Sequence, residues 1–374
     1  MGPFMNQLPA LVNRGGHALR AELFGMIHAR RDTRPFIRNV TADIDILRVD
    51  DVILPATITY GEPGNAWICS PRATWGDGMP HMLRERLGPA LSRCSAGLFG
   101  LFGGMLDRAS IDRAVFVNNW LIDTCFHPVM SRRTLNTMIE RAVGRWPQHA
   151  LWIRSLNAER NAALIASLRD AGFALLPTRQ VWVFDGIGLK LRMGAGLERD
   201  LARLQRTSMW TVGRNDIYPA DFPRIAALHA AMDTAPHGWA HPHYTAHFMQ
   251  YWHQAGLMEF RGFRDDEGRL QAVAGIFRIG DSISVPILGC NPALPRATQV
   301  YRLLMTRLLE ETMLGNATLC LGPGQTAYKR ERGGRPMLEY SAVLTRHLPP
   351  ARRRAVAVLE SVANRFYAPL IRRL

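Results

Sequence analysis

The chain has 374 residues, of which 47% are hydrophobic and 21% are charged, and its formal net charge is +15. This length exceeds one ordinary domain and suits two, and the hydrophobic content excludes a disordered chain. The positive charge favours an anionic partner, such as a CoA pyrophosphate, a phosphopantetheine carrier, tRNA or an anionic membrane surface, unless it only reflects an arginine-rich composition.

The five cysteines are odd in number and widely spaced, and no two of them have the spacing of a metal or redox motif. Three of them lie in apolar surroundings, and we interpret these three as core residues in a reducing cytosol. No stretch approaches the ~18 uncharged apolar residues of a membrane-spanning helix, and residues 1–20 lack the order of a signal peptide. The sequence therefore predicts a cytoplasmic protein.

Hydrophobic periodicity and turn residues predict the elements of the first half. Residues 1–39 form an arm with one helix, residues 40–190 form a first α/β domain, and residues 191–207 form a linker. The elements predicted in order are helix 17–29, strands 44–49, 53–60 and 111–121, helix 134–146, strand 150–155, helix 158–171 and strand 173–184.

The same order of strand, helix, buried strand and closing strand recurs in a second domain, residues 208–347, which indicates a duplicated α/β unit. Its predicted elements are strand 210–217, helix 219–231, helix 244–254, strands 257–264, 270–277 and 282–289, a helix from 300, strand 317–321, a loop with Tyr328-Lys329-Arg330 and a last strand. Residues 348–374 form a basic helix that packs on its own domain or, alternatively, contacts a membrane or RNA.

Several short motifs follow one another in the second domain. They are Val300-Tyr301-Arg302, Leu321-Gly322-Pro323-Gly324, residues 328–334 (YKRERGG) and Glu339-Tyr340. In this order they resemble the second half of the Fem-type and BioF2-like acyltransferases, which are tandem members of the GNAT superfamily. The resemblance covers residues 211–347 well and the first half only in outline. It implies a mixed α/β fold of two tandem GNAT-like domains, each with a central mixed sheet flanked by helices.

The resemblance also implies a donor site. In the GNAT superfamily two central parallel strands splay apart, the acyl donor's pantetheine arm enters between them, and the pyrophosphate meets the N-terminus of the next helix. The splayed strands here would be 285–291 and 317–322. The residues expected to bind the donor are Gly289, Cys290, Arg296, Gln299, Gly322, Gly324 and Arg330.

One departure from the family pattern leaves more than one kind of acyl donor possible. Typical CoA-binding members have glycines in the turn before that helix, whereas residues 292–299 (PALPRATQ) contain none. Fem-type enzymes, which the chain resembles more, often have degenerate turns at this place and take their acyl group from aminoacyl-tRNA. The donor is therefore acyl-CoA or a phosphopantetheine-bound acyl group on a carrier protein, with aminoacyl-tRNA as the alternative.

Four residues are predicted to act in catalysis. Lys329 follows the Gly-x-Gly loop at a strand end, where an ammonium group can stabilise an oxyanion or hold a phosphate. Tyr328 is predicted to donate a hydrogen bond. Either His243 or Asp233 would deprotonate an amine. His243 belongs to a histidine cluster without a neighbouring glutamate or cysteine, so no metal is predicted.

The sequence thus predicts an N-acyltransferase that moves an acyl group from a thioester donor to a small-molecule amine, with the first domain as a degenerate scaffold. The alternative enzyme is a Fem-like aminoacyl transferase that depends on aminoacyl-tRNA, in which the positive charge serves tRNA binding. The alternative outside catalysis is a module that binds RNA or a membrane surface.

Overall fold

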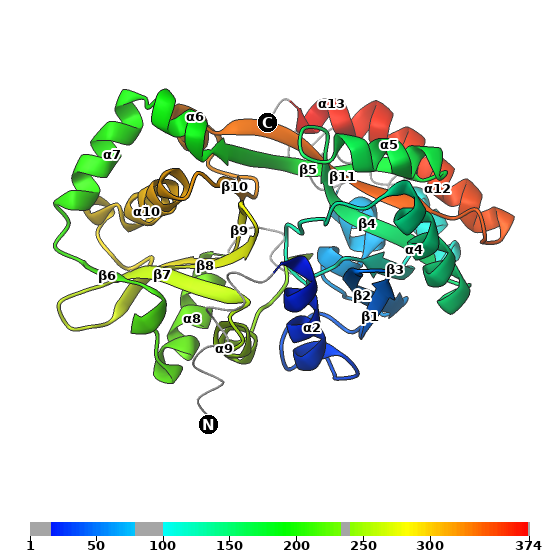
Figure 1. The fold of residues 1–374 in the computed structure, drawn as a ribbon, viewed down its shortest axis with the longest axis horizontal. Coiled ribbons are helices and arrows are strands. Elements are labelled where there is room, and N and C mark those ends of the chain that lie inside the picture. Colours follow the sequence, from blue (N-terminus) through cyan, green and yellow to red (C-terminus); the bar gives the residue numbers. More distant parts are fainter. Residues whose placement is uncertain (1–15, 79–99, 233–239, 373–374) are drawn as a thin grey trace.

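The computed structural model describes residues 16–78, 100–232 and 240–372. Its centre is one mixed sheet of eleven strands in the order β1-β2-β3-β4-β11-β5-β10-β9-β8-β7-β6. Helices cover both faces of this sheet (Figure 1). The predicted mixed α/β fold is confirmed. Within the described ranges, no helix combines the length and the apolar character that crossing a bilayer requires.

The elements have the following bounds. The strands are β1 Asp43–Val49, β2 Val52–Tyr60, β3 Arg113–Val117, β4 Ala150–Asn157, β5 Ala174–Asp185, β6 Trp210–Val212, β7 Met258–Arg264, β8 Leu270–Ile279, β9 Ser282–Cys290, β10 Thr318–Leu321 and β11 Arg335–Leu344. The labelled helices are α2 His17–His28, α4 Arg132–Arg145, α5 Ala162–Asp170, α6 Gly186–Leu191, α7 Ala195–Gln205, α8 Phe222–Met232, α9 Ala246–Gln254, α10 Val300–Leu314, α11 Thr326–Glu331, α12 Pro350–Val362 and α13 Ala368–Ile371.

Each half of the sheet repeats one plan, as the order of elements predicts. An antiparallel meander, β1-β2-β3 in the first half and β7-β8-β9 in the second, is followed by one parallel pair. The parallel pairs are β3 with β4 and β9 with β10, and a helix connects each pair, α4 in the first case and α10 in the second. Parallel neighbours need such a crossover, because a short turn cannot return the chain to the same edge.

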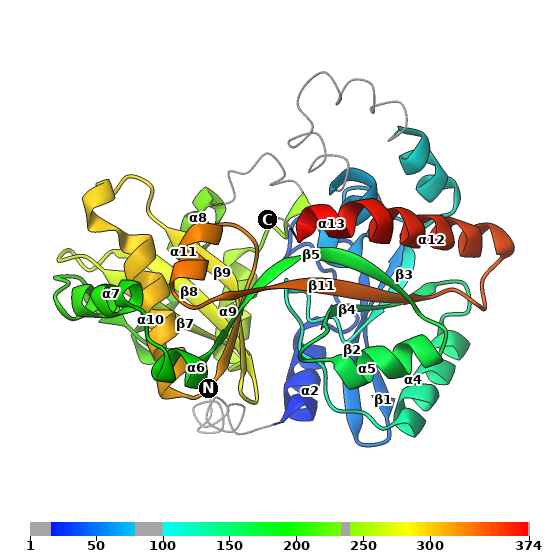
Figure 2. The same ribbon diagram turned by 90° about the horizontal axis from the view of Figure 1, so that it is seen from above.

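The two halves exchange their closing strands. β5, the last strand of the first predicted domain, pairs with β10 of the second, and β11 pairs with β4 of the first. β5 and β11 also pair with each other and run side by side between the halves (Figure 2). The predicted domain boundaries stay a prediction. In space, one continuous sheet contains the strands of both predicted domains.

The N-terminal arm joins the halves a second time. Helix α2 packs on β1 and β2, and its buried His28 accepts a hydrogen bond from Trp252 Nε1 of α9 at 2.8 Å. Beyond the helix, Arg38 N donates to His243 O at 3.0 Å, and Asn39 Nδ2 donates to His241 O at 2.7 Å. The arm therefore holds residues 241–243, which precede α9, in place.

Three predicted elements differ from the structure. Residues Tyr328-Lys329-Arg330 lie on helix α11 and not in a loop, because the chain turns at Gly324 and Gln325, which both have positive φ, and begins a helix at once. The strand predicted at 111–121 ends at Val117, where Asn118 adopts a left-handed conformation that breaks the ladder. The strand predicted at 210–217 is reduced to β6 by the turn at Arg214–Asp216.

The basic C-terminal helix packs on its own molecule, as the preferred interpretation predicts. Val356 and Leu359 of α12 are buried in the largest core cluster. Beyond α12, Tyr367 Oη donates to Thr178 O of β5 at 3.0 Å, and Gln180 Nε2 donates to Ile371 O at 3.2 Å. The tail therefore covers the sheet where the exchanged strands lie.

A buried ion pair joins the exchanged strands and makes a stability prediction. Arg179 of β5 donates to Glu339 of β11 at 2.9 Å, and the side chain of Glu339 is 3% exposed. Removing one partner of a buried pair leaves the other charge uncompensated, so Glu339→Gln should lower the free energy of unfolding by about 3–5 kcal/mol. Urea denaturation measures this change.

Glu159 provides the matched control, because its pair with Arg335 of the same strand is exposed on both sides. Glu159→Gln should change the free energy of unfolding by less than about 1 kcal/mol. Equal small effects of the two substitutions would show that the exchanged strands do not depend on the buried pair.

Candidate active site

β9 and β10 pair only where they begin. The parallel ladder joins Ser282–Ser284 to Thr318–Cys320, and among the described residues nothing later in β9 pairs with β10. β10 ends at Leu321, whereas β9 continues along β8 to Cys290. The two strands therefore diverge over the stretch where the family resemblance implies a splayed pair.

A bulge in β9 accounts for this divergence. Residues 285 and 286 of β9 lie opposite residue 276 of β8, between the pairs Gly275↔Ile287 and Phe277↔Ser284. An extra residue bends a strand and increases its twist. Pro286 is one of the two bulged residues, and it has no N–H to donate to a neighbouring strand. The sequence of β9 thus favours an open edge after Ser284.

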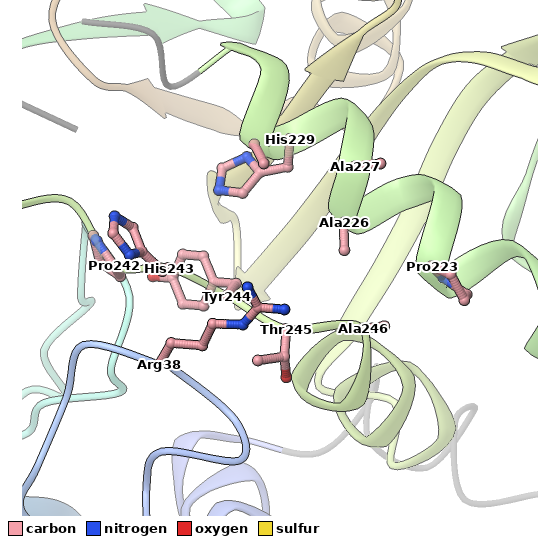
Figure 3. Close-up of a pocket in the computed structure, with 11 residues that line it drawn as sticks. Arg38, Pro223, Ala226, Ala227, His229, Pro242, His243, Tyr244, Thr245 and Ala246 are labelled. Atoms are coloured by element: carbon pink, nitrogen blue, oxygen red, sulfur yellow. The ribbon is translucent and has the colours of Figure 1, made fainter. Parts of the chain in front are cut away.

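A cavity of about 140 Å³ lies beside this part of β9. Its lining residues come from both halves of the chain, and they are Asp123, His229, Met232, His241, Pro242, Tyr244, Pro286 and Leu288. The cavity adjoins a larger hollow of about 580 Å³, with which it shares His229, Pro242 and Tyr244. His229 of α8 and His243 of the following segment project toward each other across this hollow, whose rim includes Arg38 (Figure 3).

His229 stands against the backbone of β9. Its Nδ1 lies 3.0 Å from Leu288 O and 3.4 Å from Leu288 N. Gly289 makes this approach feasible, because a Cβ at that position would lie 2.7 Å from the backbone N of His229. Gly289, which was predicted to bind the donor, therefore contacts helix α8.

The loop of residues 118–128 follows β3 and brings Asp123 to the cavity. Asn118 and Leu121 both have left-handed backbone, with φ of 58° and 56°, which is unfavourable for residues other than glycine. Tyr244 Oη donates to Leu121 O at 3.0 Å, and burial raises the pKa of Tyr244 well above its usual value. The second half of the chain thus holds a strained loop of the first half beside the cavity.

The same loop occupies the corresponding place in the first half. β3 and β4 also stop pairing after three pairs. Past that point, His127 Nε2 lies 2.6 Å from Arg154 O of β4, and Cys125 N donates to Ser155 Oγ at 3.0 Å. Because the chain's own loop bonds to this part of β4, the first half has no open edge like that of β9.

A cluster of buried charges orients Asp123. Arg179, which is paired with Glu339, donates from Nη2 to Asp123 O at 2.8 Å and lies 3.5 Å from Asp123 Oδ2 through Nη1. Arg154 Nη2 donates to the same carbonyl at 3.3 Å. The guanidinium carbons of Arg154 and Arg179 lie 4.5 and 4.6 Å from the ring centre of Trp67. The other carboxylate oxygen, Asp123 Oδ1, is buried and accepts no hydrogen bond from any described residue.

Lys329 lies where β10 ends. Its Nζ donates to Gly322 O at 2.7 Å and to Pro323 O at 3.2 Å, and the residue is 5% exposed. Burial, and secondarily the charge of Arg179, lowers the pKa of Lys329 to about 8. The ammonium group is thus close enough to the buried charge cluster to be influenced by it.

Tyr328 has different surroundings from its neighbour Lys329. Its ring lies 6.0 Å from that of Tyr301 on α10, and the guanidinium carbon of Arg332 lies 4.3 Å from its centre. Burial raises the pKa of Tyr328 to about 12, so the hydroxyl stays protonated at neutral pH. Tyr328 is packed against helix α10, and its predicted catalytic role stays a prediction.

The residues predicted to bind the donor differ in their surroundings. Gly322 and Gly324 border open space, because a Cβ at either position would have no heavy atom within 4 Å. Arg330 is exposed and lies over the ring of Trp182 at 5.7 Å. Gln299 begins α10 with a left-handed backbone and accepts from Arg302 Nη1 at 3.0 Å.

The remaining donor-site prediction concerns Cys290 and Arg296. Cys290 is buried in the core beside α10, and burial raises the pKa of its thiol to about 12. Such a thiol is not ionised at neutral pH and is no nucleophile. The backbone of Arg296 lies in the short turn Arg296–Thr298 before α10, and its side chain is outside the described part.

The two predicted bases are placed unequally. His243 is exposed at the larger hollow, and its backbone N donates to Asn39 Oδ1 at 2.8 Å. Asp233 lies outside the described residues, as does His237 of the histidine cluster. In the described part of the chain, no group of three or more histidine, cysteine, aspartate or glutamate side chains is arranged to hold a metal ion.

Comparisons with known proteins identify one domain. Residues 193–330 match the family model described as an acetyltransferase (GNAT) domain. A comparison with curated proteins finds no match. Among solved structures, L-PGS from Bacillus licheniformis has 11% sequence identity and a TM-score of 0.51 over 96% of each chain.

Two further structures match less well. A tandem GNAT protein from the clavulanic acid biosynthesis pathway has 11% identity and a TM-score of 0.41 over 91% of this chain and 93% of its own. FemX has 9% identity and a TM-score of 0.46 over 62% of this chain and 80% of its own. At such identities the likeness to L-PGS concerns the fold alone. The family model confirms the predicted relationship for this part of the chain: residues 193–330 are a GNAT-type acetyltransferase domain.

Proposed function

We propose that this protein transfers an acyl group from an activated donor to an amine. The observation that carries the proposal is the open edge of β9, which has a cavity on one side and Lys329 at the end of the neighbouring strand. Acyl transfer to an amine needs chiefly that the nucleophile and the activated carbonyl meet in the right orientation. An open strand edge beside a cavity provides a place for each reactant.

The reaction balances as follows. The amine nitrogen attacks the carbonyl carbon of the donor, a C–N bond forms, and the C–S bond of a thioester or the C–O bond of an ester breaks. An acceptor that arrives as an ammonium ion loses two protons, of which the leaving sulfur or oxygen takes one and water receives the other. His229 is our candidate for carrying the released proton, because it lines both the cavity and the hollow.

Lys329 has the charge that the intermediate requires. Attack on the carbonyl places negative charge on its oxygen, and an ammonium group held in a buried site stabilises such a charge. Its hydrogen bonds to Gly322 and Pro323 fix its position before the donor binds. We therefore propose that Lys329 stabilises the oxyanion.

The donor we propose is an acyl thioester of CoA or of a carrier protein, and its arm would lie along the open edge of β9. Transfer from aminoacyl-tRNA is the second candidate, and two observations favour it. The turn before α10 contains no glycine, and the net charge of +15 suits a long polyanion. Both donors present an activated carbonyl to the same place.

Thermal unfolding ranks the donors. A ligand at one hundred times its Kd stabilises the folded state by about 2.7 kcal/mol, so the true donor class should raise the Tm measurably. We expect acetyl-CoA or a long-chain acyl-CoA to raise it more than aminoacyl-tRNA does. A larger shift with aminoacyl-tRNA selects the second candidate. A shift with uncharged RNA alone, falling steeply with salt, would support a binding module without catalysis.

Substitution of Lys329 tests the proposed oxyanion contact. Lys329→Ala should reduce kcat/KM by about 10²-fold or more, the effect of removing one donor from an oxyanion site. Lys190→Ala is the matched control, because Lys190 is exposed and donates to the Asn316 side chain. Retained activity in Lys329→Ala, with the fold intact by circular dichroism, would exclude a role for this ammonium group in the chemical step.

The pH dependence separates chemistry from stability. Because the pKa of Lys329 is lowered to about 8, its ammonium form is lost as pH rises through 8, and kcat should fall there. The unfolded chain holds this proton up to about pH 10. The stability cost of burying this group therefore falls as pH rises from about 8 to about 10. Lys329→Arg keeps its charge and should lose the alkaline decline in the pH–rate profile. A decline unchanged in that variant would assign it to another group.

A further inference from the structure

We propose that Asp123, from the first half of the chain, binds the ammonium group of the acceptor, so that the acceptor is a primary amine that enters the cavity as a cation. The inference rests on the proposed function for the reaction that follows binding. The binding site itself is argued from contacts that do not depend on the identity of the donor.

One carboxylate oxygen of Asp123 is paired with Arg179, and the other has no hydrogen-bond donor among the described residues. Oδ2 lies 3.5 Å from Arg179 Nη1, whereas Oδ1 is buried and accepts no hydrogen bond within the described ranges. A buried carboxylate oxygen without a donor is costly, and an N–H group supplied by a ligand would remove that cost. The side chain of Asp123 is 29% exposed and lines the cavity, so rotation of the carboxylate about its last bond would present this oxygen to a ligand there.

The position of Asp123 is held before any ligand arrives. Its carbonyl oxygen accepts from Arg154 and Arg179, and Ser155 Oγ donates to it at 3.4 Å. Arg154, Arg179, Asp123 and Glu339 together carry two positive and two negative charges, so both carboxylates already have guanidinium groups nearby without the ligand. The loop that carries Asp123 therefore does not depend on an incoming cation to stay in place.

The other lining groups select for a cation with a small head. Among the described lining residues, Asp123 is the one carboxylate, and no lysine or arginine accompanies it. The hydroxyl group of Tyr244 already donates its hydrogen bond to Leu121 O, so its proton is not available to a ligand. A volume of about 140 Å³ corresponds to a few water molecules at about 30 Å³ each, enough for an ammonium group and its first carbons. The rest of the acceptor would occupy the adjoining hollow.

The location also fits the reaction. Pro286 and Leu288 of β9 line the same cavity, so an amine held by Asp123 lies beside the open edge where the donor is expected. The site is then composite, because the donor side is built by the second half and the ammonium contact comes from the first. This gives the first half a direct role in acceptor binding.

The test compares n-butylammonium with 1-butanol as probes on the full chain. Ligand-observed NMR should detect butylammonium binding to the wild-type protein and much weaker binding of the alcohol. Asp123→Asn keeps the shape of the side chain and removes its charge, so it should weaken butylammonium binding at least tenfold. Asp51→Asn is the matched control, because Asp51 is exposed in the turn between β1 and β2. This variant should bind butylammonium as the wild-type protein does.

A second variant keeps the proposal testable if Asp123→Asn does not fold. Met232→Lys adds an ammonium group at a residue that lines the cavity, and this group should compete with butylammonium for Asp123. Unchanged butylammonium binding in either folded variant overturns the inference. If donors still raise the Tm and transfer persists in that case, the proposed function stands. If no donor binds but ammonium binding depends on Asp123, the proposed function fails and the site remains.

Discussion

The buried ion pair between Arg179 and Glu339 is the interaction on which the rest of the structure depends. It connects β5 and β11, the two strands that the halves exchange, and so fixes how the halves meet. The same guanidinium group bonds to the carbonyl oxygen of Asp123 and thereby holds the loop that reaches the cavity. A buried charge is costly unless it is paired or hydrogen-bonded. The geometry of the site is therefore a consequence of the geometry of the sheet.

Most elements could be predicted from the sequence because their signals are local. The helix of α10 and the buried run of β10 follow from periodicity and composition, and Lys329 was singled out by a motif at the end of that run. The exchange of β5 and β11 could not be predicted, because nothing within either strand specifies which strands it pairs with. Pairing between distant segments leaves no mark on the spacing of residues within either one.

Asp123 was missed for a related reason. It belongs to a half that was interpreted as a scaffold, and no motif surrounds it. One signal was present, since Asn118, Asn119, Asp123 and Thr124 interrupt an otherwise apolar stretch between the strand of β3 and Phe126. Polar residues kept within a buried stretch need partners, and here those partners are Arg154 and Arg179, which come from other strands. Only the folded chain shows that this network ends at a cavity.

The two halves use one fold for different purposes, and charge explains how they can cooperate. A net charge of +15 attracts an anionic donor and opposes the approach of an ammonium ion. Exposed charges act over only about 8 Å at physiological salt, so for a ligand in the cavity the nearest carboxylate has the larger effect. With Lys329 at the end of β10 and Asp123 in the wall of the cavity beside β9, each reactant would meet a charge opposite to its own. A single half cannot offer both, because the loop that supplies Asp123 is the one that closes the first half's own opening.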